Sequence, residues 1–204
     1  FYSIDYAFMS TTAEPKDQAT ICVCKEHRTT NVKCSYVPRK GAQELNWSTK
    51  CLLEFIDSLG HTNVPVTLKS DQESAIQSVL DSVKTSRTQQ TIIEHSPVGD
   101  SQSNGSIENA VRKVQGQIRV LKIALEDKYK TKFQIDHCVF PWLVEYAGFC
   151  INRFEIGRDG KTPYARLKGK PFTRRLCTFG ECVHALRNLK TSDDAGCLLY
   201  TSDA

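Results

Sequence analysis

The chain has 204 residues, enough for one sizeable domain with a buried core. Hydrophobic residues make up 40% and charged residues 25%, a composition typical of a globular protein and not of a disordered one. No apolar run approaches the roughly 18 residues that a membrane span needs, and no signal segment opens the chain, so we expect no membrane partner. The net charge is only +4, so a polyanionic partner must meet a local basic patch.

The cysteines indicate a reducing compartment. There are nine, an odd number, and none forms a Cys-x-x-Cys pair or a regular disulfide framework. We therefore predict reduced thiols and a nuclear or cytosolic protein that is not secreted.

The first 40 residues predict three strands. Polar and apolar residues alternate in "FYSIDYAF" (1–8), which is typical of a strand, and this strand carries Asp5. Two β-branched, Cys-rich runs between 19 and 37 are separated by the polar "KEHRTT" and predict a hairpin. We interpret Cys22, Cys24 and Cys34 as small buried residues and not as ligands.

The pattern then changes to helices alternating with strands. Helices are predicted over 42–60, 73–83 and 141–154, and strands over 64–71 and 91–96. Gly60 is a plausible helix C-cap, and Pro141 fits only a first helical turn. We expect Trp47 and Trp142 to be core residues, or else part of an oligomer interface. Together the elements predict an α/β fold, a mixed sheet flanked by helices.

Residues 1–155 form the predicted domain, and the amino-acid composition changes after them. Residues 156–190 are rich in Gly, Pro and basic residues, and predict a linker followed by the start of a small C-terminal segment. Residues 191–204 are predicted to be a non-native tail, because "CLLYTSDA" (197–204) resembles a translated sequencing adapter. The only methionine is Met9, so we expect a fragment of a longer protein.

Three carboxylates fall where chemistry is expected in such a sheet. Asp5 lies in the first strand, Asp71 at the end of a later strand, and Glu108 in the predicted first turn of a helix. Strand ends and helix starts converge at one edge of an α/β sheet, where ligands commonly bind. Carboxylates gathered there repel one another unless cations neutralise them, and Mg²⁺ prefers oxygen ligands. Two such ions can promote in-line phosphoryl displacement.

The helix that follows Ser96 carries a second pattern. One apolar stripe comprises Ile107, Val111, Val114, Ile118, Leu121 and Leu125. An adjacent stripe comprises Glu108, Arg112, Gln115, Arg119 and Lys122. The cations of this second stripe are suited to DNA phosphates. The structural alternative is that Glu108 complements the helix dipole and pairs with Arg112.

These residues resemble a known family. "SIDYA", "LKSDQESAI" and "SPVGDSQSNGSIENAVRKVQ" are similar to the three motifs of retroelement integrase catalytic cores, of the D,D-35-E type and the RNase H-like superfamily. Asn104, Gly105 and Glu108 match the Asn-Gly-x-x-Glu segment of that family. "LVEYAGFCINRF" resembles its later helix, and "GKTPYARLKGKPF" with "CTFGECV" resembles the copia-like segment that follows. The similarity spans about residues 1 to 185.

The resemblance implies an RNase H-like fold and an LTR-retrotransposon integrase that processes DNA 3′ ends and transfers strands. Asp5, Asp71 and Glu108 would be the catalytic and metal-binding triad for a two-metal Mg²⁺ or Mn²⁺ site formed with DNA. Element ends and target DNA would be the partners of a homo-oligomer, in the nucleus after a cytoplasmic particle stage. Asn104 in the motif, and Lys168 and Lys170 in the basic run, would join the helix stripe in binding DNA.

The motifs depart from the family at two points. Gln72 and Glu73 follow Asp71 where the family often has Gly, and one extra residue separates Asp71 from Glu108. The upstream zinc domain would precede Phe1, so no zinc is expected here. His95 is interpreted as a loop or core residue. Two alternatives stay open: a related RNase H-like nuclease or transposase, and a catalytically inactive domesticated DNA-binding relic.

Overall fold

A five-stranded mixed sheet forms the centre of the chain. The computed structural model describes residues 1–10, 18–38, 40–41, 47–96 and 101–182, without the side chains of 101–103. The strand order is β3-β2-β1-β4-β5, with the first three antiparallel and the last two parallel to β1. The strands are β1 (Tyr2–Ser10), β2 (Gln18–Glu26), β3 (Val32–Val37), β4 (Val66–Ser70) and β5 (Thr91–His95). The α/β class and all five predicted strands are confirmed.

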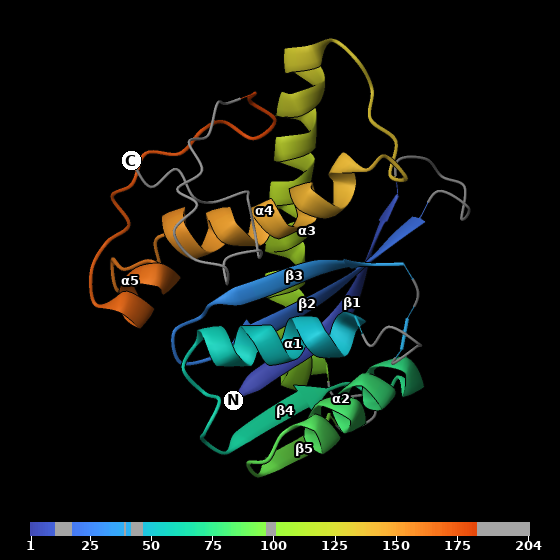
Figure 1. Cartoon of the computed structure of the whole chain (residues 1–204), viewed down its shortest axis with the longest axis vertical. Coiled ribbons are helices and arrows are strands. Elements are labelled where there is room, and N and C mark those ends of the chain that lie inside the picture. Colours follow the sequence, from blue (N-terminus) through green and yellow to red (C-terminus); the bar gives the residue numbers. More distant parts are fainter. Residues whose placement is uncertain (11–17, 39, 42–46, 97–100, 183–204) are drawn as a thin grey trace, which may run out of the picture. The chain divides into compact units, whose positions relative to one another are not determined.

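Helices cover both faces of this sheet (Figure 1). On one face lie α1 (Trp47–Ser58) and α2 (Ser74–Ser86), whose apolar residues share a core with the even-numbered residues of β1. On the other face lie α3 (Ser101–Tyr129) and α4 (Val139–Phe154). The short α5 (Pro163–Lys168) packs against α4.

The alternation along β1 assigns its side chains to the two faces. Tyr2, Ile4 and Tyr6 are buried in the α1/α2 core. The intervening positions, among them Asp5, face α3 because successive strand residues point to opposite sides. The single polar atom of Tyr2 is satisfied, since its hydroxyl lies 2.5 Å from His61 Nδ1. One strand thus supplies both a core and a candidate site.

The described cysteines are free, and Cys22, Cys24 and Cys34 are buried as predicted. The prediction that the tryptophans are core residues is wrong, since Trp47 is 48% exposed and Trp142 54% exposed, and an oligomer interface stays a prediction for both. Each begins or nearly begins its helix and lies outside the buried stripe, so helical periodicity alone does not place it. Among the described residues, no helix is long and apolar enough to cross a membrane.

The helix α3 begins earlier than the sequence predicts. It starts at Ser101, so Glu108 lies seven residues, about two turns, inside it and not in its first turn. Ser, Asn and Gly are poor helix formers, which explains the error. The helix is 29 residues long and buries Ile107, Val114 and Ile118. Tertiary packing of this kind overrides weak local propensity.

Residues 156–172, predicted to belong to a linker, pack with the preceding elements. The chain divides into two compact units, Phe1–Phe172 and Thr173–Ala204. Thr162 accepts a hydrogen bond from the Ala165 amide to cap α5, and Gly169 ends it in the left-handed conformation. Phe172 meets Phe149, Phe154 and Tyr164 edge-on, while the Arg153 guanidinium lies 3.5 Å from the Phe149 ring centroid. The predicted tail, 191–204, lies outside the described residues.

The contact between α4 and β3 leaves no space at Gly148, which yields a test of the packing. A Cβ added there would lie 2.8 Å from Cys34 Sγ, whose thiol donates to the Val144 carbonyl at 2.8 Å. We expect Gly148→Ala to lower the free energy of unfolding by about 1 to 3 kcal/mol. Gly116→Ala, with nothing within 4 Å, should instead be neutral or stabilising by up to about 1 kcal/mol. Chemical denaturation measures both, and equal effects would contradict this packing.

Candidate active site at the carboxylate edge of the sheet

The parallel pairing of β1 with β4 sets Asp5 level with Asp71. Ser3 of β1 pairs with Lys69 of β4, so two residues further along each chain are Asp5 and Asp71. Asp5 is still within its strand, whereas Asp71 directly follows β4. Both are half-buried. A register one residue different would send Asp5 to the opposite face, because side chains alternate along a strand.

The loop after β4 is tied to the loop after β5. Asp71 Oδ1 accepts a hydrogen bond from the Glu73 amide at 3.2 Å, which orients the carboxylate. Gln72 Nε2 donates to the Ser96 carbonyl at 3.3 Å, and the Ser96 amide donates to the Ser70 carbonyl at 3.0 Å. The Ser96 hydroxyl pairs with the side chain of Asn104 in α3. The predicted DNA-binding residue Asn104 therefore links the helix that carries Glu108 to the strand that precedes Asp71.

Asp5 lies within electrostatic reach of the other two predicted carboxylates. Burial and then the neighbouring Asp71 carboxylate raise the pKa of Asp5 from its usual 3.8 to about 6. A hydrogen bond from the Tyr6 amide opposes the rise, while Glu73 and Glu108 add to it. The site therefore concentrates negative charge on a partly desolvated carboxyl group, which a bound cation would relieve.

Glu73 is a fourth carboxylate at the site that the sequence-based prediction did not include. It forms a 2.5 Å ion pair with Lys40, which follows β3. The Lys40 ammonium also lies 4.5 Å from the ring centroid of Phe8 and 5.1 Å from that of Tyr6. The position of Glu73, two residues after Asp71, was the available sequence signal. Lys40 comes from a distant segment and carried no signal.

The structural alternative for Glu108 is not supported by its surroundings. Glu108 is exposed on α3, and no ion pair joins it to Arg112 among the described residues. Helix-dipole stabilisation fades within the first turn, and Glu108 lies beyond it. Its carboxylate is therefore available to a ligand.

The other predicted DNA-binding residues fall into two groups. Arg112, Arg119, Lys168 and Lys170 are exposed, whereas Gln115 donates to the Phe8 carbonyl at 3.0 Å. Lys122 is tied to Glu126, which is only 7% exposed. Glu126 also accepts from Lys132 and the Phe133 amide, each at 3.0 Å. These hydrogen bonds lower the pKa of Glu126 to about 2, with the bond from Lys122 contributing most.

The donor set suits a hard divalent cation. Among the described residues, no three His, Cys, Asp or Glu side chains lie close enough together to hold a metal ion by themselves. Mg²⁺ does not require such a group, because it usually binds through one or two carboxylates, retained water and substrate phosphate. The carboxylate oxygens of Asp5, Asp71 and Glu108 are ligands of the type that such a cation takes, and the pairing of β1 with β4 sets the first two level with each other.

Comparison with solved structures identifies the fold. The catalytic core domain of BIV integrase matches with a TM-score of 0.52 and 17% identity, over 82% of this chain and 93% of that one. The HTLV-2 integrase catalytic core domain in complex with magnesium, in a trimeric form, matches with a TM-score of 0.55 and 15% identity, over 81% and 94%.

A third match is the simian T-cell lymphotropic virus intasome in complex with PP2A regulatory subunit B56 gamma. The TM-score is 0.58 at 14% identity, over 94% of this chain and 59% of that one. No protein-family model and no curated protein matches the sequence. The chain therefore has the fold of these integrase catalytic core domains, as predicted, while the copia-like detail stays a prediction.

The raised pKa of Asp5 predicts that removing its charge stabilises the fold, by an amount that depends on pH. Because its pKa is higher in the folded chain, ionised Asp5 destabilises the fold fully above about pH 6 and not at all well below its usual 3.8. Without divalent metal, Asp5→Asn should raise the melting temperature at neutral pH, and the gain should shrink as the pH falls through that window. The exposed Asp81→Asn is the control. A gain that is independent of pH would contradict this cause.

Proposed function

We propose that this chain is the catalytic core of an integrase, acting on DNA by metal-dependent 3′-end processing and strand transfer. The observation that carries the proposal is the register of β1 with β4, which sets Asp5 level with Asp71, with Glu108 within electrostatic reach of Asp5, in a chain with the integrase-core fold. The copia-like motifs quoted from the sequence favour an LTR-retrotransposon polyprotein as its source.

A different structural element holds each of the three carboxylates. Asp5 is held by a central strand, Asp71 by the hydrogen-bonded loop after β4, and Glu108 by a long helix packed on the sheet. Together they would hold Mg²⁺ or Mn²⁺, as a bound magnesium in the HTLV-2 core also suggests. A metal bound here would supply activation of the attacking oxygen and stabilisation of the leaving oxygen.

Both proposed reactions are in-line displacements at phosphorus. Water is the nucleophile that cleaves near a DNA end, and the freed 3′-hydroxyl is the nucleophile that attacks the target phosphodiester. The exposed Arg112 and Arg119, further along α3 from Glu108, would hold DNA phosphates without reading sequence. Joining two DNA ends favours a homo-oligomer, in line with the trimeric and intasome forms of the structural neighbours.

Strand joining tests the reaction and separates the alternatives. With an element end, target DNA and Mg²⁺ or Mn²⁺, we expect joined products that fall by about two orders of magnitude or more in Asp5→Asn, Asp71→Asn and Glu108→Gln. Glu54→Gln, on the exposed side of α1, should retain activity. Cleavage without joining would favour a nuclease, and full activity in any one variant would remove that residue from the triad.

Metal binding tests the site without relying on turnover. Calorimetric titration of Mg²⁺ or Mn²⁺ into the chain with a DNA end present should give binding that is lost in Asp71→Asn. The physical reason is that oxygen ligands hold the cation and neutralise carboxylate repulsion. Equal binding in both proteins, or none in either, would contradict the metal site. Salt-sensitive DNA binding alone would then favour a domesticated relic.

A further inference from the structure

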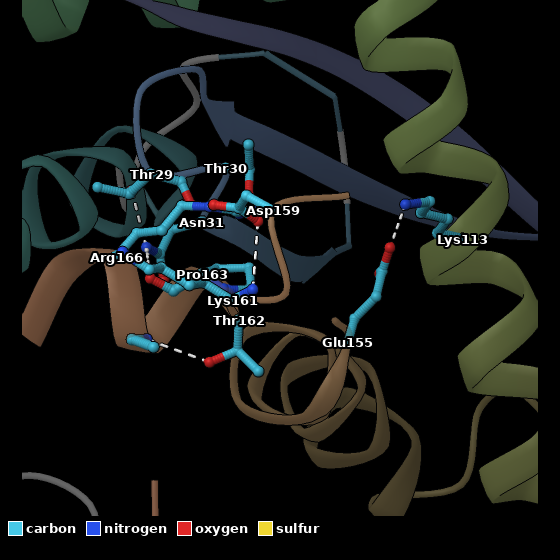
Figure 2. Close-up of polar contacts among 11 residues, drawn as sticks. Thr29, Thr30, Asn31, Lys113, Glu155, Asp159, Lys161, Thr162, Pro163 and Arg166 are labelled. Atoms are coloured by element: carbon cyan, nitrogen blue, oxygen red, sulfur yellow. Dashed lines mark hydrogen bonds and ion pairs between the residues drawn. The ribbon is translucent and has the colours of Figure 1, made fainter. Parts of the chain in front are cut away.

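A basic cavity lies beside the carboxylate site within the first compact unit. Its volume is about 210 Å³, and it is bordered by the β2–β3 turn, α3, the end of α4 and the segment around α5. Four cationic side chains and a single carboxylate line it: Lys25, Lys113, Arg158, Arg166 and Glu155. Figure 2 shows the polar contacts of the α5 segment with the β2–β3 turn, and the ion pair between Lys113 and Glu155.

Two of the four cations lack a carboxylate partner. Lys113 pairs with Glu155, and Arg166 pairs with Asp159 at 2.5 Å (Figure 2). Lys25 and Arg158 form no ion pair among the described residues. The cavity therefore carries an excess of positive charge, which an anion would neutralise.

Lys25 is the most constrained of these cations. It is half-buried and donates to the Ser106 hydroxyl at 2.8 Å, a neutral partner. Burial, and next the nearby Lys113 ammonium, lower the pKa of Lys25, while the Glu155 carboxylate opposes the change. A partly desolvated cation with a neutral partner gains more from an anion than a surface lysine does.

The far wall of the cavity is held in place by hydrogen bonds. The Arg166 guanidinium donates to the Thr29 carbonyl at 3.2 Å and to the Thr30 hydroxyl, and Asn31 donates to the Pro163 carbonyl at 3.2 Å. At Gly157 an added Cβ would lie 2.0 Å from Arg166 Nη2, so glycine permits this approach. The segment around α5 is thereby fixed to the β2–β3 turn before any ligand binds.

On both β2 and α3, the cavity lies next to the candidate carboxylates. Lys25 pairs with Ser3 in the β1–β2 ladder, two residues along from the Asp5–Val23 pair and on the same face of the sheet. On α3, Ser106 and Asn109 flank Glu108 in sequence, and Asn109 lines the cavity. A DNA strand engaged at Glu108 would bring its neighbouring phosphates close to this cavity, because phosphates recur about every 3.4 Å of rise along a strand.

We propose that this cavity binds a backbone phosphate of the DNA strand whose scissile phosphate lies at the carboxylates. Lys25 and Arg158 would make the new contacts, with Arg166 as a preorganised wall. This inference rests on the proposed DNA-directed function, but it concerns binding and not chemistry. It adds a positioning site at the β2–β3 turn and α5, away from the basic stripe of α3.

The salt dependence of duplex DNA binding by the full chain tests the proposal. We expect Lys25→Gln and Arg158→Gln each to weaken binding and to reduce the slope of log K against log salt by about 1. Lys84→Gln, the same charge change on exposed α2, should leave the slope unchanged. Glu155→Gln should tighten binding where Glu54→Gln does not. Unchanged slopes in both cavity variants, or a drop shared with Lys84→Gln, would overturn the proposal.

Two further measurements distinguish the DNA contact from a loss of folding and from the binding of a free anion. Thermal melting shows whether Lys25→Gln is folded. Lys25→Arg, which keeps the charge, should restore the salt slope of DNA binding. Because Arg158 is exposed, its variant is an independent test. Calorimetry with inorganic phosphate addresses the other source of the anion. Phosphate binding that is lost in Lys25→Gln while DNA affinity and slope stay unchanged would assign the cavity to a free anion and overturn the proposal.

Strand joining by the unmodified chain distinguishes the two proposals. If no strands are joined, yet the cavity variants alter the salt slope and the control does not, the proposed reaction fails and the phosphate site stands. If strands are joined and the cavity variants behave like Lys84→Gln, the reaction stands and the phosphate site fails.

Discussion

The burial of Asp5 beside a second carboxylate, imposed by strand register, is the constraint on which the site depends. The pairing of Ser3 with Lys69 brings Asp5 level with Asp71, and the packing of α3 adds Glu108. The fold holds these groups together although the raised pKa of Asp5 marks the arrangement as costly. A folded domain can retain such a site because the two hydrophobic faces of the sheet supply its stability.

The helix α3 transmits the rigidity of the core to the site. Its buried stripe lies against β1 and β2, and the side chains beside that stripe extend from Glu108 along the exposed face. The hydrogen bond between Ser96 and Asn104 fixes the start of the helix to the loops that follow β4 and β5. Carboxylates from three separate elements therefore keep one spatial relation, which is what a site of fixed geometry requires.

The segment around α5 gives the first compact unit a second basic region. Arg166 joins Asp159 to the β2–β3 turn, and the aromatic contacts of Phe172 attach the chain that follows α5 to α4. The cationic cavity formed there begins at Asn109, next to Glu108, whereas the basic stripe continues from Glu108 along α3. Two basic regions around one carboxylate edge are suited to an extended polyanion, because each phosphate contact adds position without sequence.

The sequence by itself determined the strands, the alternation of β1 and most of the buried stripe of α3, because hydrophobic period is a local property, and motif spacing pointed to three carboxylates as the candidate site. Tertiary structure alone decided the start of α3, the exposure of Trp47 and Trp142, and the inclusion of α5 in the first unit. It also brought Lys40 to Glu73 and Lys25 to Lys113. Such pairings depend on contacts between distant segments, for which a single sequence carries no periodic signal.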